Sequence, residues 1–408
     1  MDRQIIRDLA GRYANIANSD KNRERVTLYK AVNDLHMIRP VILTNEIPWH
    51  EMNVDGELDL RCEDAKMREL EWFFRTKLFE QKHFPCDNYL RPYYPVYKDG
   101  NFGRLSMPID ETRLPQSEGG YIFSHEYHDI LQNEEDLEKL VWTPGYYNRE
   151  NTMRRLEFAA EAIGDILPVQ VVGTEYGTNN NLWDQVAEYR GVANLLNDLI
   201  ERPEFMHKIA RKLTDAYIRS IREAVKYNLF AAELPELHCS PGFTNDLPPI
   251  ADYDHIEPKN VWGRGVAQIF GNVSPAMQEE FDTQYQLEAL APFGLVYYGC
   301  CERLDNKLRL LMKMKNLRKI SITPWSDIDV AAEILENRYE MAVKHNPAYV
   351  STAFDEETIR GEFDRTWRAA KRNGCSFDVV LKDISTVAGK PGHLFKWAEV
   401  AAEYANNY

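Results

Sequence analysis

The chain has 408 residues, a formal net charge of −15 and 12% aromatic residues. This acidic balance argues against a nucleic-acid or anionic-membrane partner, because phosphate surfaces are bound by clustered Lys and Arg. The charged start of the chain lacks the apolar centre of a secretory signal, and no apolar run is long enough to span a bilayer, so we expect a cytoplasmic protein without a membrane anchor.

Helical and strand-like segments alternate along the chain. Apolar residues recur at helical spacing over 22–36, 63–81, 132–140, 150–164, 185–198, 203–228, 275–290, 303–315, 327–344, 355–373 and 393–406. Short β-branched or aromatic runs lie between them, at 39–47, 90–97, 168–177, 234–241, 294–301, 317–325, 348–354 and 377–385. Such short, nearly continuous apolar runs are typical of parallel strands buried on both faces.

Eight strand–helix units predict an α/β fold of the TIM (β/α)8 barrel type. The barrel would form one domain over 1–408, preceded by an N-terminal helical extension. The stretch 98–167, rich in Pro, Gly and acidic residues, does not fit a minimal unit and is interpreted as an insertion or lid after strand two. A second insertion-like stretch covers 242–274. A two-domain, doubly wound fold is the alternative.

The active site of a TIM barrel lies at the carboxyl ends of its strands, so the residues that follow each predicted strand are the candidates. Thiols and imidazoles are good zinc ligands, and a carboxylate can complete the shell. The candidate metal ligands are His238, Cys239, Cys300, Cys301 and Glu302. Two cysteines that pack as small apolar residues are the alternative interpretation of "YYGCCE" (297–302). A disulfide between these neighbours would close a strained ring.

Two further groups of residues are candidates for the site, all near the ends of predicted strands except Arg264, which lies in the stretch 260–277. Carboxylates and an imidazole that could act as general acids or bases are Glu46, His50 and Glu175. Aromatic and polar side chains that could bind a substrate are Trp49, Tyr176, Asn180, Arg264, Tyr298 and Trp325. Ordinary loop packing and turn chemistry are the alternatives for these residues.

The segments "GLVYYGCC", "LRKISITPWSDIDVAAEIL", "FDVVLKDIS" and "KPGHLFKWAEVAAEY", within 290–400, resemble the uroporphyrinogen decarboxylase superfamily. The resemblance implies a TIM barrel. It also points to two activities, decarboxylation of porphyrinogens and zinc-dependent methyl transfer with corrinoid proteins. In the methyltransferases a His-x-Cys-Gly motif ends this strand. Cys300 matches its cysteine, whereas Tyr298 stands in the place of its histidine. Lys382 and Asp383 stand near the place of a further cysteine ligand.

The arginine-rich signature of the decarboxylases is absent from "RPVILTNEIPWHEMN" (39–53). The resemblance therefore favours a methyltransferase that moves a methyl group between a small substrate, for example an aromatic methyl ether, and a corrinoid protein, with zinc as Lewis acid. A metal-free decarboxylase or lyase that uses Glu/His acid–base chemistry is the alternative, and a non-catalytic binding barrel is a third reading. The resemblance also suggests a homodimer.

Overall fold

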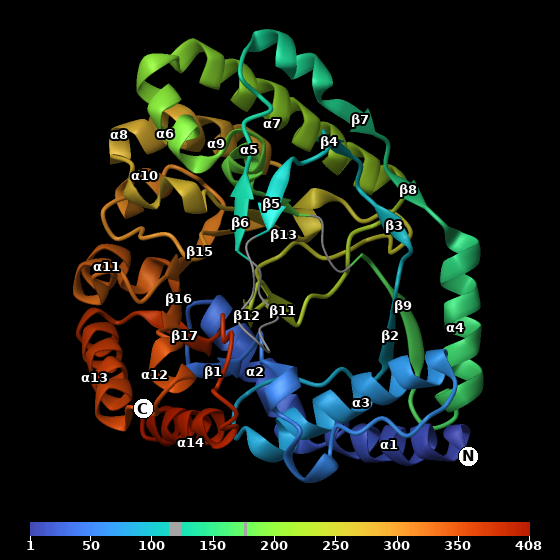
Figure 1. Ribbon diagram of the computed structural model, residues 1–408. Coiled ribbons are helices and arrows are strands. Elements are labelled where there is room, and N and C mark those ends of the chain that lie inside the picture. Colours follow the sequence, from blue (N-terminus) through green and yellow to red (C-terminus); the bar gives the residue numbers. More distant parts are fainter. Residues whose placement is uncertain (114–123, 175–177) are drawn as a thin grey trace.

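A seven-stranded parallel sheet is the main element of the computed structural model, which describes residues 1–113, 124–174 and 178–408 (Figure 1). In spatial order its strands are β1 (Val41–Thr44), β17 (Ser376–Leu381), β16 (Glu340–His345), β15 (Leu317–Ile322), β14 (Leu295–Tyr298), β13 (Trp262–Gly265) and β10 (Asn179–Asn180). Nearly every residue of β13 to β17 and of β1 is buried, as expected for parallel strands covered on both faces. The predicted α/β class is confirmed.

A separate parallel pair joins β2 (Tyr94–Tyr97) to β9 (Val169–Val172). The large sheet and this pair together contain nine strands in parallel ladders, and all of them except the two-residue β10 are four residues or longer. Within the described ranges no ladder connects β1 with β2, and none connects β9 with β10. The ladders of the described chain therefore establish a large parallel sheet and a parallel pair, and they do not close a ring.

Helices separate successive strands and cover the sheet. They are α1 (Asp2–Ala17), α2 (Asp20–Asn33), α3 (Ala65–His83), α4 (Arg149–Ile163), α5 (Leu182–Arg190), α6 (Val192–Glu201), α7 (Pro203–Lys226), α8 (Pro275–Gln278), α9 (Gln284–Leu290), α10 (Leu308–Leu311), α11 (Ile328–Leu335), α12 (Ala348–Ser351), α13 (Glu356–Asn373) and α14 (Gly392–Asn406). In Figure 1, α10, α11 and α13 lie along the outer side of β15 to β17. Phe363 of α13 and Trp397 of α14 share one apolar core with Ile320, Val343 and Val379 of these strands.

The sequence marks both ends of α13 clearly. Asp355 precedes α13, and its carboxylate accepts the backbone N–H of Thr358, so it acts as an N-cap. Gly374 ends the same helix in the left-handed conformation, with φ +67°. This position favours glycine because a Cβ is disfavoured there. The predicted helix 355–373 therefore agrees with the observed one.

The stretch between β2 and β9 folds as a nested antiparallel ribbon followed by α4. The ribbon pairs β3 (Gly100–Asn101) with β8 (Tyr146–Tyr147), β4 (Arg104–Ser106) with β7 (Val141–Thr143), and β5 (Glu111–Arg113) with β6 (His125–Tyr127). β2 and β9 pair with each other, so the chain leaves this parallel pair after β2 and returns to the neighbouring position after the ribbon and α4.

Two of the predicted strands are wrong. The run 234–241 forms a short antiparallel hairpin, β11 (Glu236–Leu237) and β12 (Ser240–Pro241), and the strand at this point of the chain is β13 instead. The run 348–354 begins with α12, and the preceding strand, β16, occupies the end of a predicted helix. Tertiary burial overrides local propensity in β16, whose "EMAVKH" holds one β-branched residue.

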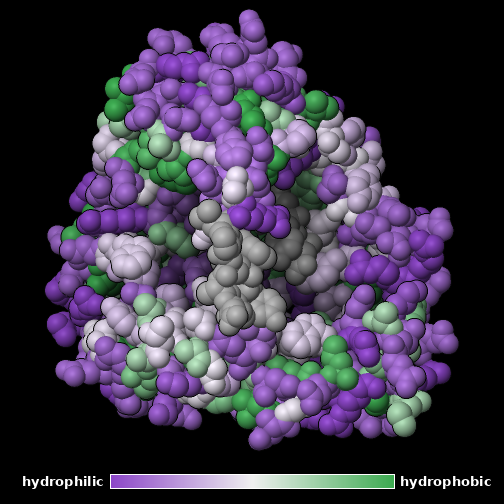
Figure 2. All heavy atoms as spheres, in the orientation of Figure 1, coloured by the Kyte–Doolittle hydropathy of each residue, from purple (hydrophilic) through white to green (hydrophobic). Residues whose placement is uncertain are grey.

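No helix among the described residues is long and apolar enough to cross a membrane. The visible face of the molecule is mainly hydrophilic, with apolar residues in small separate groups (Figure 2).

Candidate functional site

Cys300 lies at the centre of a cluster of polar side chains beyond the carboxyl end of β14. His238, from the tip of the β11–β12 hairpin, places its Nε2 2.9 Å from the Cys300 Sγ. The Cys301 Sγ lies 3.4 Å from the Cys300 Sγ, and the Lys382 Nζ, beyond the end of β17, lies 3.9 Å from it. The structure therefore brings together three of the residues predicted from the sequence, and adds Lys382.

Gly299 allows both cysteines to enter this cluster. β14 ends at Tyr298, and Gly299 then adopts φ +102°, which L side chains rarely adopt. A Cβ on Gly299 would also lie 2.6 Å from the Leu304 Cδ1. The chain turns at this point, so Cys300 and Cys301 do not point to opposite faces as neighbours on a strand would.

The His238 side chain is presented by a strained hairpin tip. His238 and Cys239 are the two residues between β11 and β12, and both have positive φ, at 43° and 65°. A two-residue turn with positive φ at both positions matches the twist of a hairpin, but it favours Asn and Gly. Glu46 and Asp383 also have positive φ. Backbone strain of roughly 1–3 kcal/mol per residue clusters at functional sites, where the surrounding structure maintains it.

Hydrogen bonds stabilise Cys300 as a thiolate. The Cys301 thiol is the largest cause that lowers the pKa of Cys300, and His238 adds to the effect, while burial opposes it. Burial lowers the pKa of His238 to about 4, so its imidazole is neutral near pH 7. A thiolate can only accept hydrogen bonds, so the His238 Nε2–H must donate. The same contact to Cys300 raises the pKa of Cys301.

Three buried cations lie near the thiolate and the turn that carries it. Burial opposes a charge on Lys382, but the negative charges of Cys300 and Glu46 raise the pKa of this ammonium. Lys344 donates to the Tyr297 hydroxyl at 2.9 Å and to Ser321, and burial lowers its pKa. The third cation, the Arg264 guanidinium, donates to a backbone carbonyl of the β14 turn at 3.4 Å and is 4% exposed.

Glu46 connects the thiolate cluster to a cavity. Its carboxylate lies 3.5 Å from the Lys382 Nζ and 3.6 Å from the Cys239 Sγ, and it accepts the backbone N–H of Asp383 at 3.0 Å. Burial raises the pKa of Glu46. The same residue lines a cavity of about 710 Å³ together with Trp49 and His50. Of the two predicted acid–base residues that the structure describes, Glu46 and His50, Glu46 is therefore the one that contacts the cluster.

His50 and Glu302 have other contacts. The His50 Nε2 lies 3.2 Å from Glu51, next to it in the chain. The Glu302 carboxylate accepts the backbone N–H of Cys300 at 2.8 Å and that of Ala267 at 3.3 Å, so it holds the turn that carries the cysteines.

Two predicted substrate contacts lie away from the cluster around Cys300. Tyr298 is fully buried, and its hydroxyl donates to Asp282 at 2.5 Å in the core behind the sheet. Trp325 is 66% exposed and contacts none of the cluster. Asn180 is buried, donates to Gln286 at 3.0 Å, and lines a separate cavity of about 880 Å³.

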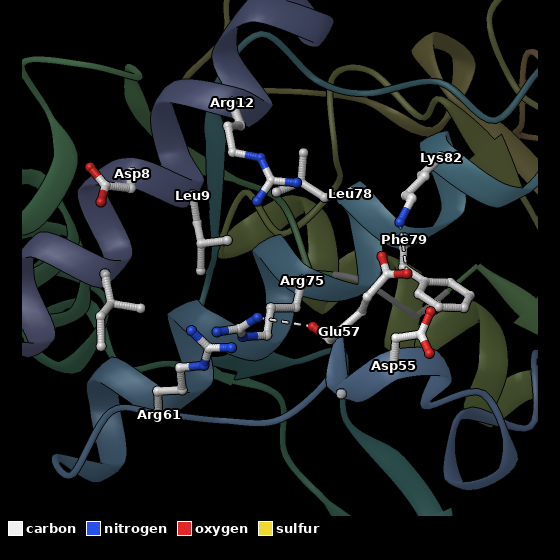
Figure 3. Close-up of a pocket in the computed structure, with 12 residues that line it drawn as sticks. Asp8, Leu9, Arg12, Asp55, Glu57, Arg61, Arg75, Leu78, Phe79 and Lys82 are labelled. Carbon is white, nitrogen blue, oxygen red and sulfur yellow. Dashed lines mark hydrogen bonds and ion pairs between the residues drawn. The ribbon is translucent and has the colours of Figure 1, made fainter.

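The predicted residues Glu175 and Tyr176 lie outside the described residues. A third cavity, of about 460 Å³, lies between α1 and α3 and is lined by charged side chains of both signs (Figure 3). It shares no residue with the cluster around Cys300. Its Lys82 pairs with Glu57 at 2.8 Å, so part of its charge is neutralised internally.

A zinc ion does not fit the side chains as they lie. In the described part of the chain, no three His, Cys, Asp or Glu side chains are arranged to hold a metal ion. Tetrahedral zinc separates a nitrogen and a sulfur ligand by about 3.5 Å. The 2.9 Å between His238 and Cys300 is instead a hydrogen-bond distance. The Lys382 ammonium, 3.9 Å from the Cys300 Sγ, also occupies space beside the sulfur that a zinc ion would need.

Of the three buried cations, Arg264 was among the predicted substrate contacts, whereas Lys344 and Lys382 were missed as site residues. Lys382 and Asp383 follow the last strand, and their position at a strand end was the available signal. Lys344 belongs to a segment predicted as helix, so no strand-end argument could identify it. Comparison of the chain with family models and with curated proteins finds no match.

Proposed function

We propose that the protein is a methyltransferase in which Cys300 carries the methyl group between a small substrate and a corrinoid protein. The observation that supports this proposal is a buried thiolate that accepts hydrogen bonds from a neutral imidazole and from a second thiol. Thiolates are the reactive form of cysteine, and a buried cysteine without such partners is inert. Substrates with an O-methyl or S-methyl group suit this chemistry.

The contacts around Cys300 suit both halves of a methyl relay. In the first half, the thiolate attacks the methyl carbon, an S–CH3 bond forms, and the substrate's O–CH3 bond breaks with its electron pair on the oxygen. Lys382 can give a proton to that oxygen. Cys300 then releases the methyl group to the nucleophilic cobalt of a corrinoid held by a partner protein, and leaves as a thiolate. A thiol of low pKa is a better leaving group, so the same hydrogen bonds assist both halves.

We further propose that the fold is a TIM barrel of the uroporphyrinogen decarboxylase superfamily. Eight strands of four or more residues in parallel ladders support this, and so does a cluster formed at the carboxyl ends of β1, β14 and β17. Zinc remains a separate prediction from the resemblance. Metal analysis of the purified protein tests it, and stoichiometric zinc would mean that His238, Cys300 and Cys301 rearrange around the ion.

A single-turnover experiment with free methylcobalamin tests the relay. The protein is mixed with methylcobalamin without oxygen, and peptide mass spectrometry locates any added methyl group. We expect S-methylation of Cys300 with release of cob(I)alamin. Cys300→Ser should abolish both signals, whereas Cys375→Ser, at a buried cysteine of the sheet core, should leave both unchanged. Wild-type protein that stays unmethylated and releases no cob(I)alamin would contradict the proposal.

The three buried cations favour decarboxylation as a second candidate function. Arg264, Lys344 and Lys382 could bind a substrate carboxylate, and Glu46, whose pKa burial raises, could return a proton to the carbon after CO2 leaves. Release of labelled CO2 from a panel of small carboxylates tests this function. It should persist in Cys300→Ser and be lost in Glu46→Gln, which is the reverse of the pattern expected for methyl transfer.

A further inference from the structure

The hairpin that carries His238 is fastened by a buried polar network. The Lys319 Nζ donates to the Ser240 Oγ at 2.7 Å and to the Pro241 carbonyl at 2.6 Å. The Ser240 hydroxyl in turn donates to the Asp378 Oδ2 at 2.6 Å. Ser240 is 1% exposed, and Lys319 and Asp378 are 0% exposed. The hydroxyl therefore uses both its donor and its acceptor capacity inside the protein core.

The network spans three neighbouring strands. Lys319 of β15 pairs with Glu340 of β16 at 2.9 Å and lies 3.8 Å from Asp378 of β17. The ladder register places Lys319 directly beside Glu340. The buried charges of Lys319, Glu340 and Asp378 compensate one another, so moving one of them would leave the others unpaired. The network therefore has few alternative arrangements. It is a rigid support for whatever is bonded to it.

The short hairpin has little stability of its own. Each arm contributes two residues to the ladder, and Ser240 pairs with Leu237 directly below the tip. An isolated two-stranded hairpin is marginal in water, so its position depends on what holds it. Asn33 and Trp262 bond to carbonyls of Pro241 and Gly242, further from the tip. Cys239 lies 3.6 Å from Glu46, and Asn45 donates to Glu236 at 3.1 Å, but both contacts are only partly buried. Among the bonds that join the hairpin to fully buried polar groups, those of Ser240 are closest to His238.

We propose that Ser240 is a positioning residue, which fixes the hairpin tip on the buried Lys319–Asp378 pair and thereby aims His238 at Cys300. Its effect on catalysis rests on the proposed methyl transfer, but its effect on the His238–Cys300 contact does not. The contact is short, and an error of about 1 Å in such a site can reduce a rate by roughly a hundredfold.

Ser240→Ala tests this role with two readouts. Imidazole NMR of 15N-histidine protein, with the His238 signal assigned by its loss in His238→Gln, reports the hydrogen bond to Cys300. We expect the His238 signal of Ser240→Ala to move toward that of a free neutral imidazole. The rate of Cys300 methylation by methylcobalamin should fall by roughly tenfold to a hundredfold. Asn33 and Trp262 still hold the hairpin, so the variant should fold.

Matched variants separate positioning from general stability. Ser240→Thr keeps the hydroxyl and should restore the His238 signal. Ser376→Ala removes another buried hydroxyl, at the first residue of β17, and should leave the signal unchanged. A wild-type His238 signal in Ser240→Ala, even with a lowered melting temperature, would overturn the inference. If the His238 signal shifts in Ser240→Ala but the wild-type protein transfers no methyl group, the positioning role is supported and the proposed function is rejected.

Discussion

At the scale of single residues, the chemistry of the site depends on which of its groups is ionised and which remain protonated. Cys300 is a thiolate because Cys301 and His238 donate to it, and these two partners remain neutral. The assignment follows from donor capacity, since a thiolate has no proton to give. The adjacency of the two cysteines in "GCC" therefore has a chemical consequence, in addition to any packing role.

Cys301→Ala should raise the pKa of Cys300, because the variant lacks the thiol that stabilises the thiolate most. The sign follows from the thiolate being the form that the hydrogen bond favours. Peptide-resolved alkylation with iodoacetamide across pH measures the midpoint for Cys300. Cys375→Ala, which removes a distant buried thiol, is the control and should leave the midpoint unchanged. An unchanged midpoint in Cys301→Ala would show that the second thiol does not act on the first.

Asp282 makes stability depend on pH. Burial raises the pKa of Asp282 to about 7 from 3.8, so its contribution is fully present below about pH 3.8 and is lost as pH rises through about 7. Asp282→Asn lacks the carboxyl group and should lose this dependence. The free energy of unfolding of the variant, relative to that of wild type, should therefore increase by a few kcal/mol from pH 4 to pH 8. Urea unfolding at several pH values measures it, with exposed Asp254→Asn as the control. Parallel pH curves for Asp282→Asn and wild type would refute the prediction.

At the scale of elements, the sequence predicted long regular segments well and short irregular ones poorly. Helices with clear caps, such as α13, and apolar strands, such as β14 and β17, lie where periodicity placed them. The hairpin tip was missed because His238 and Cys239 are not turn-forming residues, and each arm is only two residues long. β13, "WGRG", escaped because two glycines interrupt any apolar pattern. These elements depend on tertiary contacts that no local pattern encodes.

The same limits apply to the site. Cys300 could be identified because it directly follows an apolar strand and a glycine. The contact with His238 could not, since it joins residues 62 positions apart through a turn that the sequence does not mark. Tyr298 lies in the core because successive residues of a strand point alternately to its two faces, an alternation that the sequence alone does not assign to the site or to the core.

The loop after β17 depends on one carboxylate. Glu51 accepts hydrogen bonds from the Thr386 hydroxyl at 2.5 Å and from the backbone N–H groups of Val387 and Gly389 at 2.9 and 2.8 Å. Glu51→Ala should destabilise the protein by about 2 kcal/mol, because the loop loses a charged acceptor. Urea unfolding measures the change. Glu399→Ala, at an exposed position of α14, should change stability by less than about 0.5 kcal/mol. Equal effects of the two variants would argue against this role of Glu51.

At the scale of the whole molecule, an acidic protein encloses a locally cationic site. The net charge is −15, yet Arg264, Lys344 and Lys382 lie around the thiolate. The long-range field repels anions from the protein, whereas the local field attracts them once they enter. The balance between the two decides whether anionic substrates are accepted, which matters for the choice between methyl transfer and decarboxylation.

Salt should separate these two fields. We expect added salt to speed alkylation of Cys300 by anionic iodoacetate relative to neutral iodoacetamide, because salt screens the long-range repulsion more than buried charges. The ratio of the two rates, measured by peptide mass spectrometry at increasing salt, gives the answer. A ratio that falls with salt would mean that attraction by the local cations dominates, and would favour carboxylate substrates.

The most direct test of the central claim is the alkylation midpoint of every cysteine in the wild-type protein. The pKa of Cys300 is lowered, whereas the pKa of each other thiol is raised, namely those of Cys62, Cys86, Cys239, Cys301 and Cys375. We expect Cys300 alone to react fully with iodoacetamide below pH 7, with the other five reacting slowly even at pH 9. A midpoint for Cys300 near that of a free thiol, about 8.5, would contradict the account.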